Sequence, residues 1–247
     1  MGIFPRDPHF VFGNDVVDLF EERDRPAALL DRYVRKICTD AEASFLRKED
    51  DFEEALWKVW ALKESAFKAV NRRDRSRSFR YRELEVQPGF HAVHDHGTGL
   101  ALEASVFFER QSRFKTESRK ETDCQCVVGI AWSAPAGEDA LLVSWIDHVE
   151  EEADLSREVR EQAASILRDL EIDAAADIVQ RRPAPDGELL PPVLDLPYGE
   201  APVSLSHHGR LVMTTMHLDT SVERYLKHWQ DRPTLRDGRR IFFLPAK

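Results

Sequence analysis

The helix predicted over residues 52–70 constrains the fold more than any other stretch of the sequence. Its apolar residues recur at helical spacing and form one stripe, as expected of a helix that faces a core: Leu56, Val59, Trp60, Ala66, Phe67 and Val70. Glu64, Trp57 and Lys68 lie together at one edge of this stripe. Lys63 falls inside it, which is unusual for a lysine unless its stem packs and its amine reaches outward.

The other predicted elements are short and mix both kinds of secondary structure. Further helices are expected at 26–37, 39–47 with Thr39 as N-cap, 150–170 and 221–230. Strands are expected at 13–19, 79–86, 100–108, 126–132, 140–146 and 177–180, with a strand pair around Gly209. A histidine-rich turn, "HAVHDHGTG", joins two of the strands, and the proline-rich stretch "RRPAPDGELLPPVLDLPYGEAP" is expected to be extended or looped.

The order of predicted strands and helices in the first part of the chain is repeated in the second part. Sliding the first part by 112 residues places Gly97 on Gly209, and a shift of 116 residues places Gly13 on Gly129, which is a weak repeat carried by pattern more than by identity. We therefore predict an α+β fold of two pseudo-symmetric halves, 1–118 and 119–247, each a small antiparallel sheet packed on a long helix. The halves differ chemically, because the second carries Ala131 where the first carries Asp15.

Composition narrows the class of protein. The chain of 247 residues is 42% hydrophobic and 32% charged, and it has no apolar run approaching ~20 residues, so we expect a soluble globular protein without a membrane partner. The start, "MGIFPRDPHF", lacks the pattern of a secretory signal, and three cysteines without zinc spacing are expected to be reduced thiols. These features predict a cytoplasmic location.

Two polar segments are candidates for binding an acidic partner or a metal ion. The net charge of −10 argues against general nucleic-acid binding, yet residues 71–82, "NRRDRSRSFRYR", carry six arginines against one aspartate. They are either a solvated basic loop or a site for an acidic partner. His91, His94, Asp95 and His96 are either transition-metal ligands or a plain solvent-facing turn.

Three motifs occur together in this chain. They are G-x-D in the strand that contains Asp15, W-x-x-K-E-S-x-x-K from Trp60 to Lys68, and S-x-S-H-x-G from Ser204 to Gly209. Alone, Glu64 and Lys68 would be an ordinary ion pair on a helix surface. Together, the motifs resemble those of the 4′-phosphopantetheinyl transferases, which move the phosphopantetheine arm of coenzyme A onto a serine of a carrier protein.

The resemblance implies roles for individual residues. Asp15 and Glu64 would be the two protein ligands of a Mg²⁺ ion that also binds the coenzyme A pyrophosphate, which suits the preference of this ion for hard oxygen ligands. Lys68, and with it Lys63, would contact the coenzyme, and Glu64 would activate the serine directly or through a water. Ser206 and His207 would bind the nucleotide end near the 3′-phosphate, while His208 is expected to be an ordinary surface histidine.

Some positions depart from the pattern of the longer, surfactin-type relatives. Val17 stands where they carry a second acidic residue, as in the small holo-acyl-carrier-protein synthases. A basic residue is missing ahead of the S-H motif, where Arg181, Arg182 or Arg210 could substitute. The motif order is also exchanged, so the resemblance implies a fused, monomeric pseudo-dimer with swapped halves and a coenzyme A cleft between them.

Three function classes stay open at this point. The first is a Mg²⁺-dependent transferase of the holo-acyl-carrier-protein synthase type, with coenzyme A and an apo carrier protein as partners. The second is an inactive relative that binds coenzyme A or a carrier protein, whose expected sign, loss of Asp15 or Glu64, is not seen. The third is an unrelated module that binds acidic partners through the arginines of residues 71–82.

Overall fold

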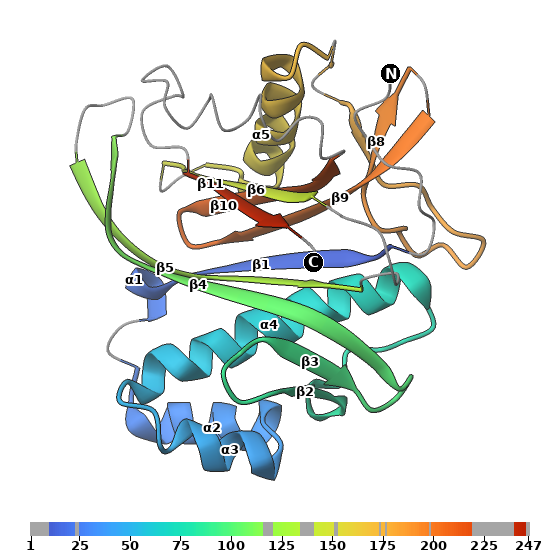
Figure 1. The fold of residues 1–247 in the computed structure, drawn as a ribbon. Coiled ribbons are helices and arrows are strands. Elements are labelled where there is room, and N and C mark those ends of the chain that lie inside the picture. The colour runs from blue at the N-terminus through green and yellow to red at the C-terminus, as the bar shows by residue number, and fades with distance from the viewer. Residues whose placement is uncertain are drawn as a thin grey trace. The chain divides into compact units, whose positions relative to one another are not determined.

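The computed structural model describes most of the chain and divides it into two compact units. The described residues are 10–22, 25–115, 121–133, 141–150, 153–172, 174–175, 177–197, 199–218 and 240–245. The N-terminal unit comprises residues 9–112 and 124–134, and the C-terminal unit chiefly residues 135–247. Each unit is described by itself below (Figure 1).

The N-terminal unit contains a five-stranded antiparallel sheet with the strand order β1-β5-β4-β3-β2. Its strands are β1 (Phe12–Asp18), β2 (Leu84–Val86), β3 (Ala92–Asp95), β4 (Leu100–Lys115) and β5 (Glu121–Trp132). Strand β1 pairs only with β5, and Asp15 lies opposite Gly129 in this register. The first predicted motif therefore lies on an edge strand of the sheet.

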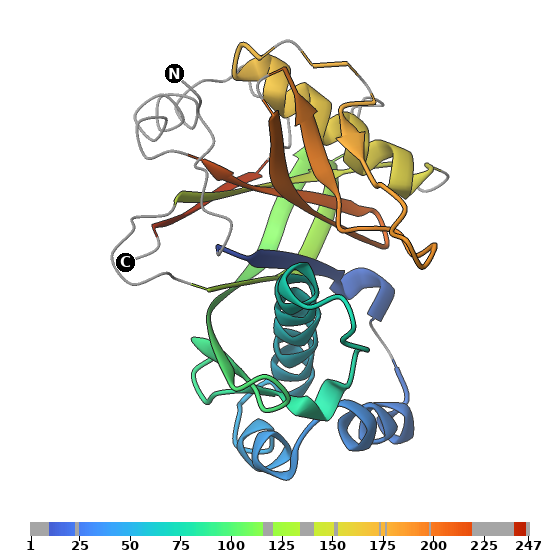
Figure 2. The ribbon, with the colours of Figure 1, turned by 90° about the vertical axis from the view of Figure 1, so that its right-hand side faces the viewer.

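Helix α4 (Phe52–Arg73) packs on β1 and lies between that strand and the helices α2 (Ala27–Ile37) and α3 (Asp40–Leu46), as Figures 1 and 2 show. A one-turn helix, α1 (Leu19–Glu22), follows β1 directly. Capping explains two of the helix starts: Thr39 and Glu42 form a capping box at α3, and the Asp51 side chain accepts from the Glu54 amide at α4. The predictions of helices over 26–37, 39–47 and 52–70 are confirmed.

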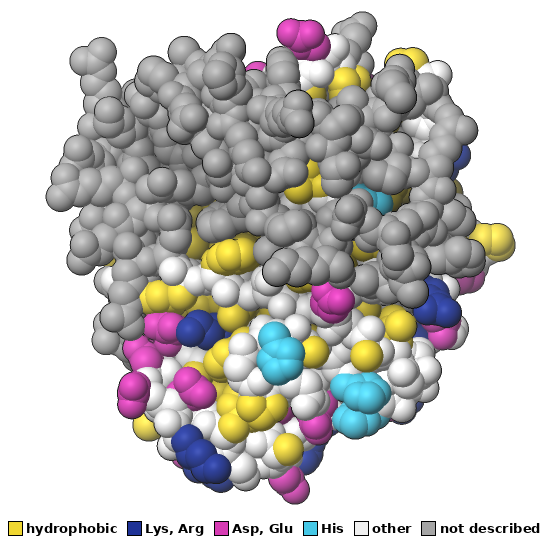
Figure 3. All heavy atoms as spheres, viewed as in Figure 1, with side chains coloured by type: hydrophobic (Ala, Val, Ile, Leu, Met, Phe, Trp, Pro, Cys, Tyr) yellow, Lys and Arg dark blue, Asp and Glu magenta, His cyan; other side chains and the backbone are white. Residues whose placement is uncertain are grey.

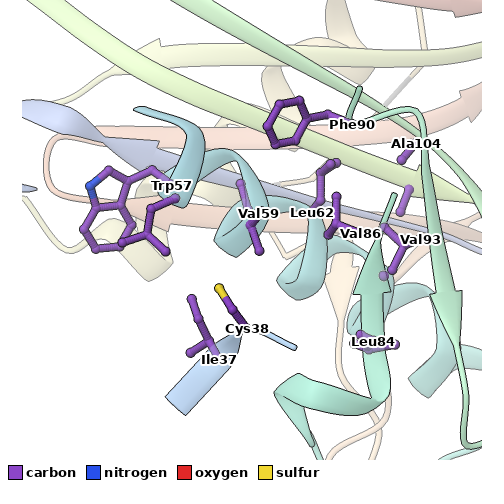
Figure 4. Close-up of a cluster of buried hydrophobic side chains, with 14 of the residues drawn as sticks. Ile37, Cys38, Trp57, Val59, Leu62, Leu84, Val86, Phe90, Val93 and Ala104 are labelled. Carbon is purple, nitrogen blue, oxygen red and sulfur yellow. The ribbon is translucent and has the colours of Figure 1, made fainter. Parts of the chain in front are cut away.

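The core of this unit gathers around α4. Fully buried side chains of the helix, such as Val59 and Leu62, meet Ile37 at the end of α2 and Val86 and Val93 from the sheet (Figure 4). Burial of this kind contributes about 25 cal/mol per Å² of apolar surface removed from water. The apolar stripe read from the sequence packs into the core, and the helix is also buried on other sides, since Ala61, Leu62 and Ser65 outside the stripe are fully buried.

Two predictions for residues 79–99 need correction. Only Leu84–Val86 of the predicted strand 79–86 is a strand, because residues Tyr81–Glu83 form a 3₁₀ turn, η1. Conversely, the predicted histidine-rich turn contains strand β3, in which Val93 and Asp95 are buried and His94 is exposed. This alternation is the two-residue period of a half-buried strand.

The C-terminal unit contains a six-stranded antiparallel sheet, ordered β11-β6-β10-β9-β8-β7. Its strands are β6 (Leu141–His148), β7 (Val179–Gln180), β8 (Val193–Leu196), β9 (Gly199–His208), β10 (Leu211–Leu218) and β11 (Arg240–Pro245). Helix α5 (Leu155–Asp169) packs against β9 and β10. The strand pair around Gly209 is confirmed, and the helix predicted over 221–230 lies outside the described residues.

The α+β class is confirmed, with an antiparallel sheet in each unit. Strand β5, which the sequence-based division assigned to residues 119–247, pairs with β1, and its residues from Cys124 onward group with the N-terminal unit. The repeat had placed Gly13 over Gly129, but these glycines lie on neighbouring strands of one sheet. Among the described residues, no helix is long and apolar enough to cross a membrane.

Candidate active site

Glycines bring helix α4 unusually close to the sheet at the strand that carries Asp15. A methyl group at Gly13 would overlap the Ser65 carbonyl oxygen and lie 2.8 Å from Lys68 Cβ. At Gly129 it would lie 2.7 Å from the Ala61 carbonyl carbon. Neither position can hold a side chain without moving the helix, so the glycine of the G-x-D motif sets the distance between Asp15 and α4.

Ser65 fastens the helix at this contact. Its buried hydroxyl donates to the carbonyl oxygens of Ala61 (2.7 Å), in its own helix, and of Gly129 (2.9 Å), in strand β5. A hydroxyl buried here satisfies its hydrogen bonding only through such partners. The serine of the K-E-S motif therefore has a structural role that the sequence analysis did not assign.

Lys68 joins the helix to the strand through charge. Its Nζ donates to the backbone oxygen of Asn14 (2.7 Å) and to Asp15 Oδ1 (3.0 Å). Asp15 is largely buried, and the Lys68 side chain keeps 29% of its surface exposed. The ammonium is thus held beside the Asp15 carboxylate at a place that solvent still reaches.

Glu64 belongs to the same cluster of charges. Burial, and after it the negative charge of Asp15, raise the pKa of its carboxyl group to about 7, while the charge of Lys68 acts in the opposite direction. The three side chains therefore interact electrostatically. The structure brings together Asp15, Glu64 and Lys68, as the motifs predicted.

Lys63 does not join this cluster. Its side chain is fully buried, and its Nζ donates to Glu42 Oε2 (2.7 Å) and to the backbone oxygens of Ile37 and Tyr81 (2.8 Å each). An ammonium has three protons, and all three are used here. This geometry opposes the prediction that Lys63 contacts a coenzyme, because its amine is turned into the core rather than outward.

Three of the six arginines of residues 71–82 form ion pairs with acidic groups of the same unit. Arg77 pairs with Asp95 (2.7 Å) and Glu83 (2.9 Å), and two more pairs are Arg80 with Glu83 and Arg82 with Asp40. Arg72 instead donates to the Phe12 backbone oxygen. This internal compensation weakens the case for a polyanion site.

The histidine segment is built around Asp95 rather than around a metal. The Asp95 carboxylate accepts from Arg77, from the Gly97 amide (2.9 Å) and from the Thr98 hydroxyl (2.6 Å). The rings of His94 and His96 stack with centroids 5.1 Å apart, and histidine side chains reach the surface on the face drawn in Figure 3. Among the described residues, no group of three or more His, Cys, Asp or Glu side chains could hold a metal.

Ser206 and His207 lie near the end of β9 in the C-terminal unit. They pair with Met213 and Val212 of β10, and the alternation of the strand buries Ser206 and exposes His207. In the same unit, partial burial and then the charge of Arg160 lower the pKa of Arg181, so these two guanidinium groups lie within electrostatic reach of each other.

Comparison with protein families identifies the segment that carries the charge cluster. The model of the 4′-phosphopantetheinyl transferase superfamily matches residues 11–122. The match covers 112 of the 247 residues of the chain, from the start of β1 to the beginning of β5. The superfamily match contains Asp15, Glu64 and Lys68 and ends before Ser206 and His207. A comparison with curated proteins finds no match to the chain.

The residues of the superfamily segment fit a divalent cation. Asp15 and Glu64 supply carboxylate oxygens from two elements, and a cation there would offset both the burial of Glu64 and the charge of Asp15, which raise the pKa of Glu64. Mg²⁺ commonly takes one or two carboxylates together with phosphate oxygens and waters.

Sequence reasoning missed Gly13, Gly129, Ser65 and Glu42 as contributors to the site. The motifs contain Gly13 and Ser65, so their positions were visible although their tasks were not. The T-x-x-E pattern marks Glu42 as a capping residue, but nothing in the sequence marks it as the partner of Lys63, which lies 21 residues further on.

Proposed function

We propose that this protein transfers the 4′-phosphopantetheine group of coenzyme A to a serine of an apo carrier protein, in a Mg²⁺-dependent reaction. The observation that supports this most is the convergence of Asp15, Glu64 and Lys68 inside the segment that matches the superfamily. The superfamily name describes the transfer itself, and coenzyme A and a carrier protein are its general partners.

The transfer forms one bond and breaks another at phosphorus. The serine Oγ attacks the phosphorus that bears pantetheine, and the bond from this phosphorus to the bridging oxygen breaks, which releases adenosine 3′,5′-bisphosphate. Bound Mg²⁺ would neutralise charge on the pyrophosphate. The serine proton needs an acceptor, and Glu64, with a pKa raised to about 7, suits this task directly or through a water.

Lys68 supplies a fixed positive charge beside the reacting group. Its Nζ is already held by Asn14 and Asp15, so it loses little conformational freedom when a phosphate approaches. In the C-terminal unit we propose that Ser206 and His207 bind the nucleotide end of coenzyme A. Arg181 is our candidate for the unassigned anion contact, because Arg160 repels it and an anion would relieve that repulsion.

The proposal also covers the type of transferase, the two halves, the oligomeric state and the cellular location. Val17, in place of a second acidic residue, supports the holo-acyl-carrier-protein synthase type. One antiparallel sheet with a packed helix in each unit supports two pseudo-symmetric halves in a monomer, which light scattering after size exclusion would test. We also place the protein in the cytoplasm, where the free thiols of Cys38 and Cys126 would stay reduced.

Intact-protein mass spectrometry of the carrier tests the reaction. The protein is incubated with coenzyme A, Mg²⁺ and apo carriers of fatty-acid, polyketide and peptide-synthetase systems, and one carrier should gain the mass of phosphopantetheine. Excess EDTA should stop the gain, and so should Asp15→Asn in the presence of Mg²⁺. No gain with any carrier contradicts the transferase. Coenzyme A binding by calorimetry without turnover would then favour the inactive relative.

A further inference from the structure

Four aromatic side chains form a wall along the face of α4 that carries Glu64. The wall consists of Trp60, Phe67, Phe79 and Tyr81. Trp60 and Phe67 lie four residues before and three residues after Glu64, so all three project from one side of the helix. The Phe79 ring stacks on Phe67 with centroids 4.5 Å apart and lies 6.5 Å from Trp60. Phe79 therefore spans the helical turn from which Glu64 projects.

Tyr81 completes the wall and interacts with Glu64. Its ring stacks on Trp60 at 5.3 Å and contacts Phe79 at 4.3 Å. Burial, and then the negative charge of Glu64, raise the pKa of the Tyr81 hydroxyl. The wall thus supplies apolar surface next to the carboxylate on one side, while Asp15 and Lys68 face it from strand β1 and the next helical turn.

Two of the four aromatic residues come from a segment with little regular structure, so something must hold them in place. Only η1 and the three-residue β2 follow Phe79 along this segment. Lys63 Nζ donates to the Tyr81 carbonyl oxygen (2.8 Å), and Glu42 Oε1 accepts from the Val86 amide (2.7 Å). The ion pair between Lys63 and Glu42, at 2.7 Å, joins these two attachments.

The ion pair is completely enclosed and completely satisfied. Lys63 and Glu42 are both 0% exposed, and Glu42 also accepts from the Thr39 amide, which anchors it to the start of α3. Such a pair fixes the relative positions of the segments that it links, but it is not a large source of stability. All three protons of the Lys63 ammonium are used in hydrogen bonds, so none is left for a ligand.

We propose that Lys63 is a positioning residue, which together with Glu42 clamps residues 79–86 onto α4 and thereby holds the aromatic wall against Glu64. The proposal rests on the proposed function, because it assigns Lys63 a task in arranging that same site. It replaces the expected coenzyme contact with an action through Tyr81 and Phe79. A displacement of the wall by about 1 Å would misplace the Glu64 carboxylate enough to lower turnover by about 10- to 100-fold.

The test compares Lys63→Met and Glu42→Gln with the double variant Lys63→Met/Glu42→Gln. Each single change leaves one buried charge without its partner and should lower the unfolding midpoint sharply. The double variant removes both charges and should regain much of that stability, but the Tyr81 carbonyl then loses its bond to α4 and keeps the bond from the Leu84 amide of its own turn. Lys58→Met is the matched control, since it removes another lysine–glutamate pair, with Glu54, from the same helix.

Steady-state kinetics with coenzyme A and an apo carrier separate positioning from its rivals. The double variant should keep a KM for coenzyme A within about twofold of the wild type, while its kcat stays about 10- to 100-fold lower. Recovery of kcat together with stability would mean that the pair only supports folding. A KM for coenzyme A that rises in both variants lacking Lys63, but not in Glu42→Gln, would indicate a direct contact between Lys63 and coenzyme A. Either result overturns the proposal.

Hydrogen–deuterium exchange tests the clamp without relying on activity. Peptides covering residues 79–86 should exchange faster in the double variant than in the wild type or in Lys58→Met, while peptides from β5 stay unchanged. Unchanged exchange over 79–86 overturns the clamp. If the wild type modifies no carrier, the proposed function fails, and the exchange experiment still decides whether Lys63 holds this segment.

Discussion

Replacing Gly13 by alanine should damage both the stability and the site, because the added methyl group has no room. Its carbon would lie 2.8 Å from Lys68 Cβ and 2.9 Å from the Ala69 amide nitrogen, and it would overlap the Ser65 carbonyl oxygen. Carbon contacts become favourable near 3.5–4.0 Å, so strand and helix must separate by about 1 Å. Overpacking of this kind lowers the free energy of unfolding by about 1–3 kcal/mol.

The same separation of strand and helix should also lower the catalytic activity. Asp15 lies two residues beyond Gly13 on β1, and the helix that would be displaced carries Glu64 and Lys68. A shift of about 1 Å in such a site lowers activity by about 100-fold. Urea unfolding would give the stability change, and the rate of carrier modification by intact-protein mass spectrometry would give the activity.

Gly99→Ala is the matched control for this prediction. Gly99 has φ +73° and no atoms within 4 Å of an added carbon, so alanine there strains the backbone without touching the helix. It should lower the free energy of unfolding by about 1–2 kcal/mol and leave the activity intact. Gly13→Ala protein with wild-type stability and wild-type turnover would refute the argument that this glycine sets the distance between strand and helix.

Three further predictions concern the same helix. Glu64→Gln should abolish carrier modification while circular dichroism shows an intact fold; retained turnover would remove Glu64 from the mechanism. Because folding raises the pKa of Glu64 from 4.5 to about 7, folded protein binds more protons than unfolded protein in this range. Metal-free wild type should therefore lose up to about 3 kcal/mol of unfolding free energy relative to Glu64→Gln as the pH rises from 4.5 to 7, and parallel profiles would contradict this. Ser65→Ala should lower the unfolding free energy by about 1–3 kcal/mol in thermal or urea unfolding, because it leaves two buried carbonyl groups without this donor; an unchanged value would show that neither bond contributes.

The sequence was informative where local pattern decides the structure. Helical periodicity predicted α4, and the capping residue Thr39 predicted the start of α3. The three motifs predicted that Asp15, Glu64 and Lys68 would come together although about fifty residues separate the first from the others. Here the resemblance to a known family supplied what the spacing of the residues alone could not.

The sequence was uninformative where a role depends on a partner far along the chain. Lys63 was interpreted as an outward-reaching lysine because neither Glu42, 21 residues before it, nor Tyr81, 18 residues after it, is visible in the helical pattern. The alternation of aromatic residues at 79–81 predicted a strand, but the Tyr81 carbonyl bonds to a side chain instead. The fit of Gly129 against α4 depends on the register of β1 and β5, which no local pattern encodes.

Lys68 also determines how the site behaves before any divalent ion arrives. Its ammonium pairs with Asp15 and reduces the electrostatic repulsion between Asp15 and Glu64, so a lysine side chain already balances part of the negative charge. Folding of this region therefore does not have to wait for metal. Under the proposed function, Mg²⁺ would compete with this tethered amine for the same Asp15 oxygen, which favours weak, readily exchanged metal binding over permanent capture.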